Sequence, residues 1–229
     1  MLTVALIFIA LVCYLIGSIP TAFLFVKKLT GKDVRTIGSG NIGAMNAYRS
    51  LKEKSGKLAA FGFFFVIIID MAKGALSVIV ARQFHCVDFD TNFLFALAAF
   101  FVVLGHNYSI FMKFTGGRGA ACLMGISLYL DPLSFFVWGL PLVFCASLVQ
   151  IILEKKNMVE KINWKKITDL FMMIGGKQML GRLIGLILGP IFLYFYNVQV
   201  FLPIASGTTL LLLKNISRFE EYVKSLKQN

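Results

Sequence analysis

The stretch "LAAFGFFFVIIIDMAKGALSVIVAR", residues 58–82, decides the fold class of this 229-residue chain. Its length exceeds the ~20 mostly apolar residues that an α-helix needs to cross a bilayer. Asp70 and Lys73 lie near its middle, where charges are costly, and their spacing lets them pair on one face of a helix. The stretch predicts a transmembrane helix. We interpret its two charges as a structural pair or a polar contact between helices, in preference to a catalytic group.

Six further apolar runs surround this stretch, and hydrophobic residues make up 58% of the sequence. Soluble domains are about 45–50% apolar. The six runs are residues 2–26, 93–112, 119–131, 133–153, 182–196 and 198–214. The sequence therefore predicts an all-α fold, in which residues 1–229 form a single integral membrane domain, a polytopic protein of about seven transmembrane helices.

The charge pattern predicts how these helices are oriented. The chain carries 23 Lys and Arg against 11 Asp and Glu, a formal net charge of +12. Nearly all of the cations fall on one side of a seven-span arrangement, in segments 27–57, 113–118, 154–181 and 214–229, whereas the turn at 85–90 on the other side carries Asp88 and Asp90. Cytoplasmic loops are rich in Lys and Arg, so we expect the N-terminus outside and the C-terminus in the cytoplasm. This accounts for the basic charge without a nucleic-acid partner.

Processing and metal signals are weak in this sequence. No Lys or Arg precedes the first apolar run, so we interpret the run as a retained helix rather than a cleaved signal. The four cysteines and two histidines lack the spacing of a disulfide framework or a metal site. We expect no metal and no cofactor.

The segment 154–181 admits two interpretations. Apolar residues recur at helical spacing opposite lysines, at Trp164, Ile167, Leu170 and Phe171. This pattern is typical of an amphipathic helix that lies on anionic membrane lipid. A solvated loop with a few apolar residues is the alternative.

Three polar stretches on the predicted inner side are candidates for chemistry. The first, "IGSGNIGAMNAYR" (residues 37–49), offers backbone and side-chain donors to an anion and then a cation. Its candidate residues are Gly38, Ser39, Gly40, Asn41, Gly43, Asn46 and Arg49. A helix beginning here would also present its positive end to the anion. A structural turn or a helix cap is the alternative.

The second stretch, "LGHNYSIFMKFTGGRGAACLMG" (residues 104–125), again places glycines and a cation at the start of an apolar run. Its candidate residues are His106, Gly116, Gly117, Arg118 and Gly119. The spacing is not that of a P-loop. For His106, a helix-packing hydrogen bond is the alternative to a role in substrate binding.

The third stretch, "LLLKNISRFEEY" (residues 211–222), places Asn215 and Arg218 one helical turn apart, although ordinary juxtamembrane charge would give the same pattern. No Ser-His-Asp set, carboxylate pair or metal cage appears in the sequence. The three stretches together indicate a binder of phosphate-bearing ligands at the membrane surface. Any reactive group would then arrive with the substrate, while the protein supplies positioning and charge neutralisation.

The motifs "GKDVRTIGSGNIGAMNAYR", "DMAKG", "LGHNYSIFMKFTGGRG" and "NISRF" resemble, in the same order, those of the bacterial acyl-phosphate:glycerol-3-phosphate acyltransferases. The resemblance implies transfer of a fatty acyl group from acyl phosphate to the sn-1 hydroxyl of glycerol 3-phosphate. The products are lysophosphatidic acid and phosphate, and the site faces the cytoplasm at the bacterial inner membrane. It also implies phosphate contacts from Ser39, Asn46 and Arg49, from the Gly116–Arg118 turn, and from Asn215 with Arg218. A substrate phosphate would help to deprotonate the attacking hydroxyl.

The chain departs from the family pattern at several positions. Ile42 and Met45 stand where the family usually has Pro and Thr, Thr115 replaces a Lys, and Leu212 replaces a His. The family's central serine-containing segment is not visible, and Lys177 or Arg182 is a candidate to compensate for it. Loss of a charge-assisted donor costs ~1.5–3 kcal/mol. The alternative is a catalytically altered or inactive member that binds or transports a phosphorylated metabolite or anionic lipid.

Overall fold

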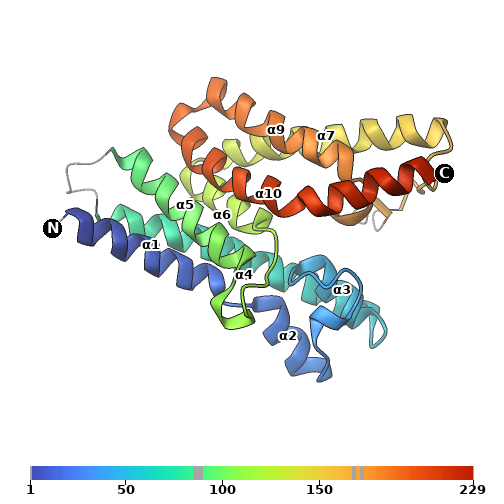
Figure 1. Ribbon diagram of the computed structural model, residues 1–229, viewed down its shortest axis with the longest axis horizontal. Helices are drawn as coiled ribbons and strands as arrows, with labels where there is room; N and C mark the ends of the chain where they lie inside the picture. Colours follow the sequence, from blue (N-terminus) through green and yellow to red (C-terminus); the bar gives the residue numbers. More distant parts are fainter. Residues whose placement is uncertain (1, 85–89, 167–168, 171–172, 229) are drawn as a thin grey trace.

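The computed structural model describes residues 2–84, 90–166, 169–170 and 173–228, and these residues form an all-helical bundle (Figure 1). Its elements in chain order are α1 (Leu2–Ser18), α2 (Thr21–Thr30), η1 (Val34–Thr36), α3 (Ala44–Lys52), α4 (Gly56–Arg82), α5 (Thr91–Asn107), η2 (Ile110–Met112), α6 (Ala120–Leu130), α7 (Pro132–Lys155), η3 (Met173–Lys177), α9 (Met179–Tyr196) and α10 (Val198–Gln228). Within the described ranges the extended structure consists of an isolated bridge between Ser109 and Thr115. The predicted all-α membrane fold is confirmed.

The seven predicted apolar runs all contain helix, but they differ in length. Five helical stretches are long and apolar enough to cross a membrane, namely Thr3–Thr30, Gly56–Arg82, Pro132–Lys155, Met179–Tyr196 and Val198–Ile216. The other two helices are shorter: α5 has 17 residues and α6 has 11. At 1.5 Å per residue, α6 is only ~16 Å long, about half the thickness of the hydrocarbon core.

The two ends of the described chain lie at opposite ends of the bundle (Figure 1). An odd number of crossings requires this arrangement. Which end faces the cytoplasm stays a prediction, and Asp88, one of the acids expected on the outer side, lies outside the described residues.

The prediction of one continuous first helix over residues 2–26 is wrong. α1 ends at Ser18 and α2 begins at Thr21, with Pro20 between them. Proline lacks a backbone N–H, and it disfavours helical geometry in the residue before it. The break turns α2 away from the direction of α1 (Figure 1).

The predicted loop at 214–229 is also wrong, because α10 continues without interruption to Gln228. The charges of Lys214 and Arg218 end the apolar stretch of this helix, but charged residues do not end helical hydrogen bonding. The predicted loop 27–57 similarly contains the end of α2 and all of α3.

An amphipathic helix does not form over the described first part of segment 154–181. α7 ends at Lys155, Asn157 adopts a positive φ of 53°, and residues 156–166 are irregular. Glu154 accepts hydrogen bonds from Ile162 N and Trp164 Nε1, which hold this irregular segment against the end of α7. Ile167 and Phe171 lie outside the described residues.

Close helix pairs form the interior, and large apolar side chains form much of the outer surface. An added Cβ on Gly74 of α4 would lie 2.0 Å from Cys122 O in α6, so these two backbones are in direct contact. Small residues give membrane helices this close approach. Phe61, Phe144 and Phe195 are more than half exposed, as expected of side chains that face lipid.

Candidate active site

The first glycine-rich stretch forms a loop that folds back over the start of α3. Gly38 and Gly40 adopt positive φ values of 56° and 67°, which favour glycine. A Cβ on Gly38 would lie 2.6 Å from Asn46 Oδ1 and 3.2 Å from Arg49 Cδ. The loop therefore needs glycine to approach the two side chains of α3 that the sequence singled out.

Asn46 holds this loop in place. Its Nδ2 donates to Val34 O at 2.7 Å and to Ile37 O at 2.8 Å, while its Oδ1 accepts a long bond of 3.4 Å from Ser39 N. The residue is only 1% exposed. Its amide is thus engaged with the protein itself, in contrast to the phosphate contact that the sequence predicted for it.

The outer part of the loop is open to a ligand. Gly38 and Ser39 are exposed, Asn41 is half-buried, and Gly43 caps α3 without a side-chain bond. The first backbone N–H groups of α3 point away from the helix at this end and suit an anion.

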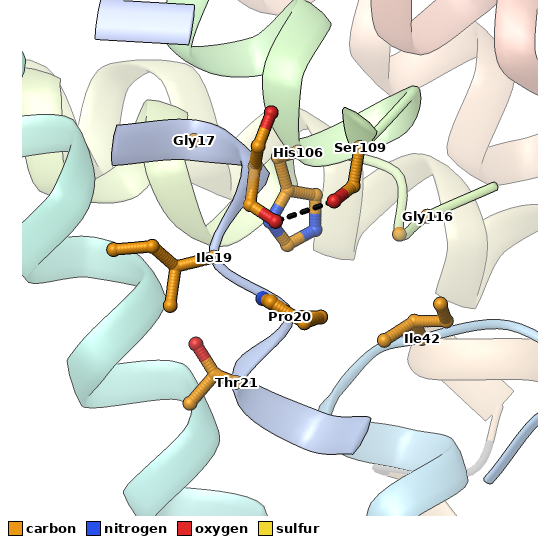
Figure 2. A pocket seen from close by; sticks show the side chains of 10 residues that line it. Gly17, Ile19, Pro20, Thr21, Ile42, His106, Ser109 and Gly116 are labelled. Atoms are coloured by element: carbon orange, nitrogen blue, oxygen red, sulfur yellow. Dashed lines mark hydrogen bonds between the residues drawn. The ribbon is translucent and has the colours of Figure 1, made fainter. Parts of the chain in front are cut away.

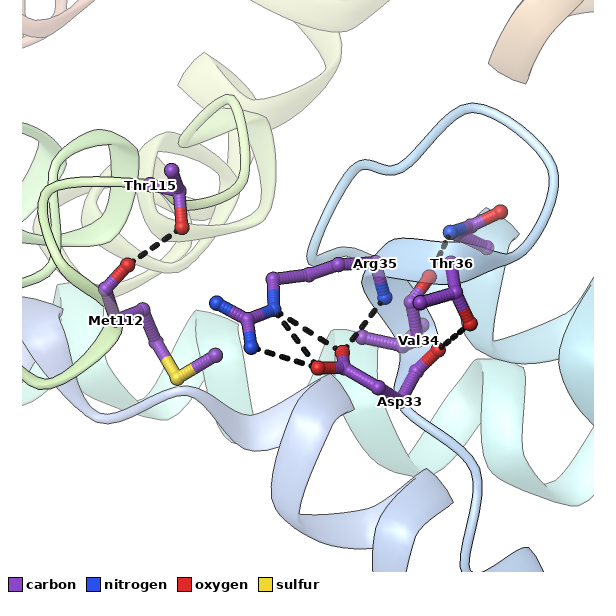
Figure 3. A network of polar contacts seen from close by, with 7 residues as sticks. Asp33, Val34, Arg35, Thr36, Met112 and Thr115 are labelled. Atoms are coloured by element: carbon purple, nitrogen blue, oxygen red, sulfur yellow. Dashed lines mark hydrogen bonds and ion pairs between the residues drawn. The ribbon is translucent and has the colours of Figure 1, made fainter.

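An ion pair between Asp33 and Arg35 lies at η1, directly before this loop. Asp33 caps η1 by accepting from Arg35 N at 2.9 Å, and its carboxylate also binds the Arg35 guanidinium, with a shortest distance of 2.6 Å (Figure 3). Hydrogen bonding from Arg35 holds the pKa of Asp33 below its usual range. Figure 3 shows the Arg35 side chain extending toward the η2 turn that carries Met112.

Arg49 brings the first and third stretches together. Burial, followed by the nearby charge of Arg218, lowers the pKa of the Arg49 guanidinium. Both side chains are half-buried, and neither forms an ion pair with a carboxylate in the part of the chain that the structure describes. Two like charges that repel each other in this way favour the binding of an anion beside them.

The second stretch forms a tight turn packed on the end of α5. Gly117 N donates to His106 O at 2.9 Å, and a Cβ on Gly117 would lie 2.0 Å from His106 Nε2. Gly116 has the same restriction against the His106 carbonyl, and Gly119 adopts a positive φ of 84° beside Asn107. Glycine is required at these positions because a side chain would collide with residues at the end of α5.

Arg118 projects from this turn at the start of α6. It is half-buried, and its side chain has no hydrogen bond or ion pair to any residue within the described ranges. Thr115, which replaces the family's Lys, is exposed and donates its hydroxyl to Met112 O at 2.6 Å (Figure 3). Arg118 is therefore the cation of this turn that is free for a ligand.

A small pocket connects the turn to the first stretch (Figure 2). It is lined by Gly17, Ser18, Ile19, Pro20, Thr21, Ile42, His106, Ser109, Gly116 and Gly117. Ile42 lies across the pocket from Gly116 in Figure 2, and Ser109 Oγ donates to Ser18 O. The α1–α2 break contributes half of these residues. They were not predicted from the sequence, although Pro20 inside an apolar run was a signal of the break.

The third stretch lies on α10, beside the end of α5. Asn107 Nδ2 donates to Leu210 O at 3.5 Å, and Lys214 Nζ lies 4.0 Å from the centre of the Tyr108 ring. Asn215 donates to Leu211 O at 2.6 Å within its own helix, while its Oδ1 is buried and has no partner among the described residues. Leu212, where the family has His, packs against the main apolar cluster.

The positions considered as compensating cations differ in what the structure says of them. Arg182 donates to Ile174 O at 3.1 Å and contacts Met179 Sδ, so its described partners are neutral. The side chain of Lys177 lies outside the described residues. Met45 meets the segment before α9, since a Cβ on Gly175 would lie 2.5 Å from Met45 Cε.

Known proteins share both the sequence pattern and the fold. A family profile described as "Glycerol-3-phosphate acyltransferase" matches residues 7–160. A protein of that name from Thermus thermophilus is 41% identical over 132 residues, 58% of this chain and 60% of the relative. Another from Bartonella henselae is 34% identical over 187 residues, 82% of this chain and 72% of the relative. The chain thus spans about 60% of the Thermus protein's length.

The fold is shared with a crystal structure of PlsY, described as an integral membrane glycerol 3-phosphate acyltransferase in its glycerol 3-phosphate form. The match has a TM-score of 0.68 at 23% identity, over 96% of this chain and 93% of that one. Given the family profile and the Bartonella relative, this chain belongs to the glycerol-3-phosphate acyltransferase family.

Proposed function

We propose that this protein transfers a fatty acyl group from acyl phosphate to the sn-1 hydroxyl of glycerol 3-phosphate at the cytoplasmic face of the bacterial inner membrane. One observation carries the proposal. Arg49 contacts one glycine-built loop, Arg118 belongs to the other, and Arg218 lies near Arg49, while none of these guanidinium groups pairs with a carboxylate within the described chain. Such a site is suited to substrates that bring two phosphate groups.

Each of the two glycine-built loops would bind one phosphate group. The loop over α3, with Ser39, Asn41 and Arg49, would hold one phosphate through backbone and side-chain donors. The Gly116–Gly119 turn with Arg118 would hold the other from the opposite side of the pocket. Asn215, whose buried Oδ1 lacks a partner among the described residues, would accept a hydrogen bond from a substrate hydroxyl.

The reaction then needs no protein nucleophile. The glycerol hydroxyl oxygen attacks the acyl carbonyl carbon, and a C–O bond forms while the bond from the carbonyl carbon to the phosphate oxygen breaks. The hydroxyl proton leaves with a phosphate oxygen of the substrates, and inorganic phosphate departs. The arginines lower the barrier by neutralising charge on the phosphates and by fixing both reactants in place.

Transport is the rival function, and it would need charged groups that line a path across the bilayer. Asp70 and Lys73 bind each other at 2.6 Å and are almost fully buried. They are committed to each other and to neighbouring backbone, which favours transfer over transport. Counterflow of labelled glycerol 3-phosphate in proteoliposomes that is abolished by Asp70→Asn combined with Lys73→Met, in a variant that still folds, would reverse this preference.

The test is transfer from palmitoyl phosphate to radiolabelled glycerol 3-phosphate by the purified protein. Replacement of one preorganised charge donor costs about 10²–10³ in rate, so Arg49→Ala and Arg118→Ala should each lose at least a hundredfold. Lys52→Ala is the matched control, since Lys52 is an exposed cation on the same helix as Arg49. Equal activity in all three variants would refute the site.

A further inference from the structure

A buried ion pair in α4 holds the α1–α2 break. Lys73 Nζ lies 2.6 Å from Asp70 Oδ1 and donates to Ile19 O at 2.6 Å. Thr21 Oγ1 donates to the same Asp70 oxygen at 3.0 Å. Ile19 and Thr21 flank Pro20, so the pair binds the chain on both sides of the break.

Stability alone is a poor explanation of this pair. Removing two charges from water cancels much of their attraction, and well-packed apolar residues would stabilise two helices as well or better. The cost is higher in a membrane domain, where buried ionisable residues are usually functional. The pair instead fixes the geometry of the break. Lys73 supplies a donor to the Ile19 carbonyl, and Asp70 supplies an acceptor to the Thr21 hydroxyl.

The break is connected to the second glycine turn through the end of α5 and Ser109. His106 Nδ1 lies 3.9 Å from Asp70 Oδ1, and the His106 carbonyl accepts the Gly117 N–H at 2.9 Å. Ser109, which lies between α5 and the glycine turn, donates its hydroxyl to Ser18 O at the end of α1. The break, the end of α5 and the glycine turn therefore form one connected unit around the pocket (Figure 2).

We propose that Asp70 and Lys73 are positioning residues for the phosphate site. They fix the break against His106 and thereby hold the Gly116–Gly117 turn in the geometry that binds the phosphate of glycerol 3-phosphate. The inference rests on the proposed transfer reaction, and neither residue touches a substrate in it. Their effect passes through the break and His106.

Thr21→Val and Thr21→Ser form a matched pair that tests this role without unbalancing a charge. Valine keeps the shape of threonine but loses the hydroxyl that binds Asp70, whereas serine keeps it. Loss of a hydrogen bond to a charged group should raise the KM for glycerol 3-phosphate ~10-fold in Thr21→Val, with kcat within about twofold of wild type. Thr21→Ser should restore the wild-type KM. A wild-type KM in Thr21→Val would overturn the inference.

The ion pair itself is tested by a double substitution. Lys73→Met alone leaves a buried carboxylate without its cation, so this variant should fold poorly. Asp70→Asn combined with Lys73→Met removes both charges and should fold, with a KM for glycerol 3-phosphate at least as high as that of Thr21→Val. A folded double variant with the wild-type KM would contradict the positioning role.

A third measurement needs no substrate. Thr115 is exposed directly before the glycine turn, and the cysteines that the structure describes are buried, so Thr115→Cys with the fourth cysteine removed (Cys86→Ser) reports how ordered the turn is through its rate of thiol labelling. Adding Thr21→Val should speed the labelling, and an unchanged rate would overturn the inference. Wild-type protein that transfers no acyl group would refute the proposed function, while the labelling comparison still decides whether the break positions the turn.

Discussion

Asn46 and Asn215 are both buried amides in the candidate site, but they differ in how their polar atoms are used. Asn46 is 1% exposed, and both ends of its amide bind the loop before α3. Asn215 is 2% exposed, donates to its own helix, and leaves Oδ1 without a partner among the described residues. The first stretch therefore builds its loop from its own side chains. The third stretch presents a buried acceptor, and we infer that a substrate completes it.

Replacing Asn46 should have the largest effect. Asn46→Ala removes the side-chain hydrogen bonds to the Val34 and Ile37 carbonyls, which keep only backbone donors, and the bond from Ser39 N, and each lost hydrogen bond costs about 1 kcal/mol. We expect the free energy of unfolding to fall by roughly 3 kcal/mol, measured by thermal unfolding in detergent. Glycerol 3-phosphate binding should fall with it. An unfolding midpoint equal to that of wild type would contradict the structural role of Asn46.

Asn215→Leu should separate activity from stability. Leucine has a similar size and leaves no buried polar atom unpaired, so the unfolding midpoint should stay the same or rise. The loss of one hydrogen bond to substrate should lower kcat/KM by about 30-fold, or ~2 kcal/mol. If the variant instead loses stability and keeps its activity, Asn215 has the same role as Asn46 and the comparison fails.

The sequence was informative about these two stretches to different degrees. Glycines and Asn46 in "IGSGNIGAMNAYR" predicted a loop and a helix start, and the structure has both. Their spacing could not reveal that Asn46 binds the loop itself, because that depends on how the loop folds back. The proximity of Arg49 and Arg218 depends on the packing of distant helices, which no local pattern encodes.

The errors in the predicted fold have physical causes. Apolar length identifies a membrane span but not its continuity, so the break at Pro20 was missed. Charge likewise marks where a span leaves the membrane, whereas α10 continues as a helix through Lys214 and Arg218. Trp164 lies in an irregular segment and donates its Nε1 hydrogen to Glu154, a contact that hydropathy cannot register.

Leu212→His should sharpen the comparison with a smaller effect. Leu212 precedes Asn215 by one helical turn, so both lie on the same side of α10. A histidine would add a polar group near the unpartnered Asn215 oxygen, and we expect transfer to rise about fivefold, or ~1 kcal/mol. The unfolding midpoint should fall slightly, because Leu212 packs on the main apolar cluster. Leu212→Met is the control, and a histidine variant no faster than the methionine variant would show that the position does not reach the site.

Replacing Asp33, which lies just before the loop that Asn46 holds, should have the smallest effect. Hydrogen bonding from Arg35 lowers the pKa of Asp33 in the folded protein, so the unfolded chain takes up a proton first as the pH falls. The contribution is therefore complete above the unfolded pKa of about 3.9 and is lost as the pH falls through the lower folded pKa. Both partners are solvent-accessible, so Asp33→Asn should cost only ~0.5 kcal/mol at pH 7. The unfolding midpoints of the two proteins should differ at pH 7 and should converge only as the pH falls below the folded pKa of Asp33. Asparagine keeps the cap to Arg35 N, so a difference that persists in acid would mean that the charge of Asp33 is not the source of its stabilising effect.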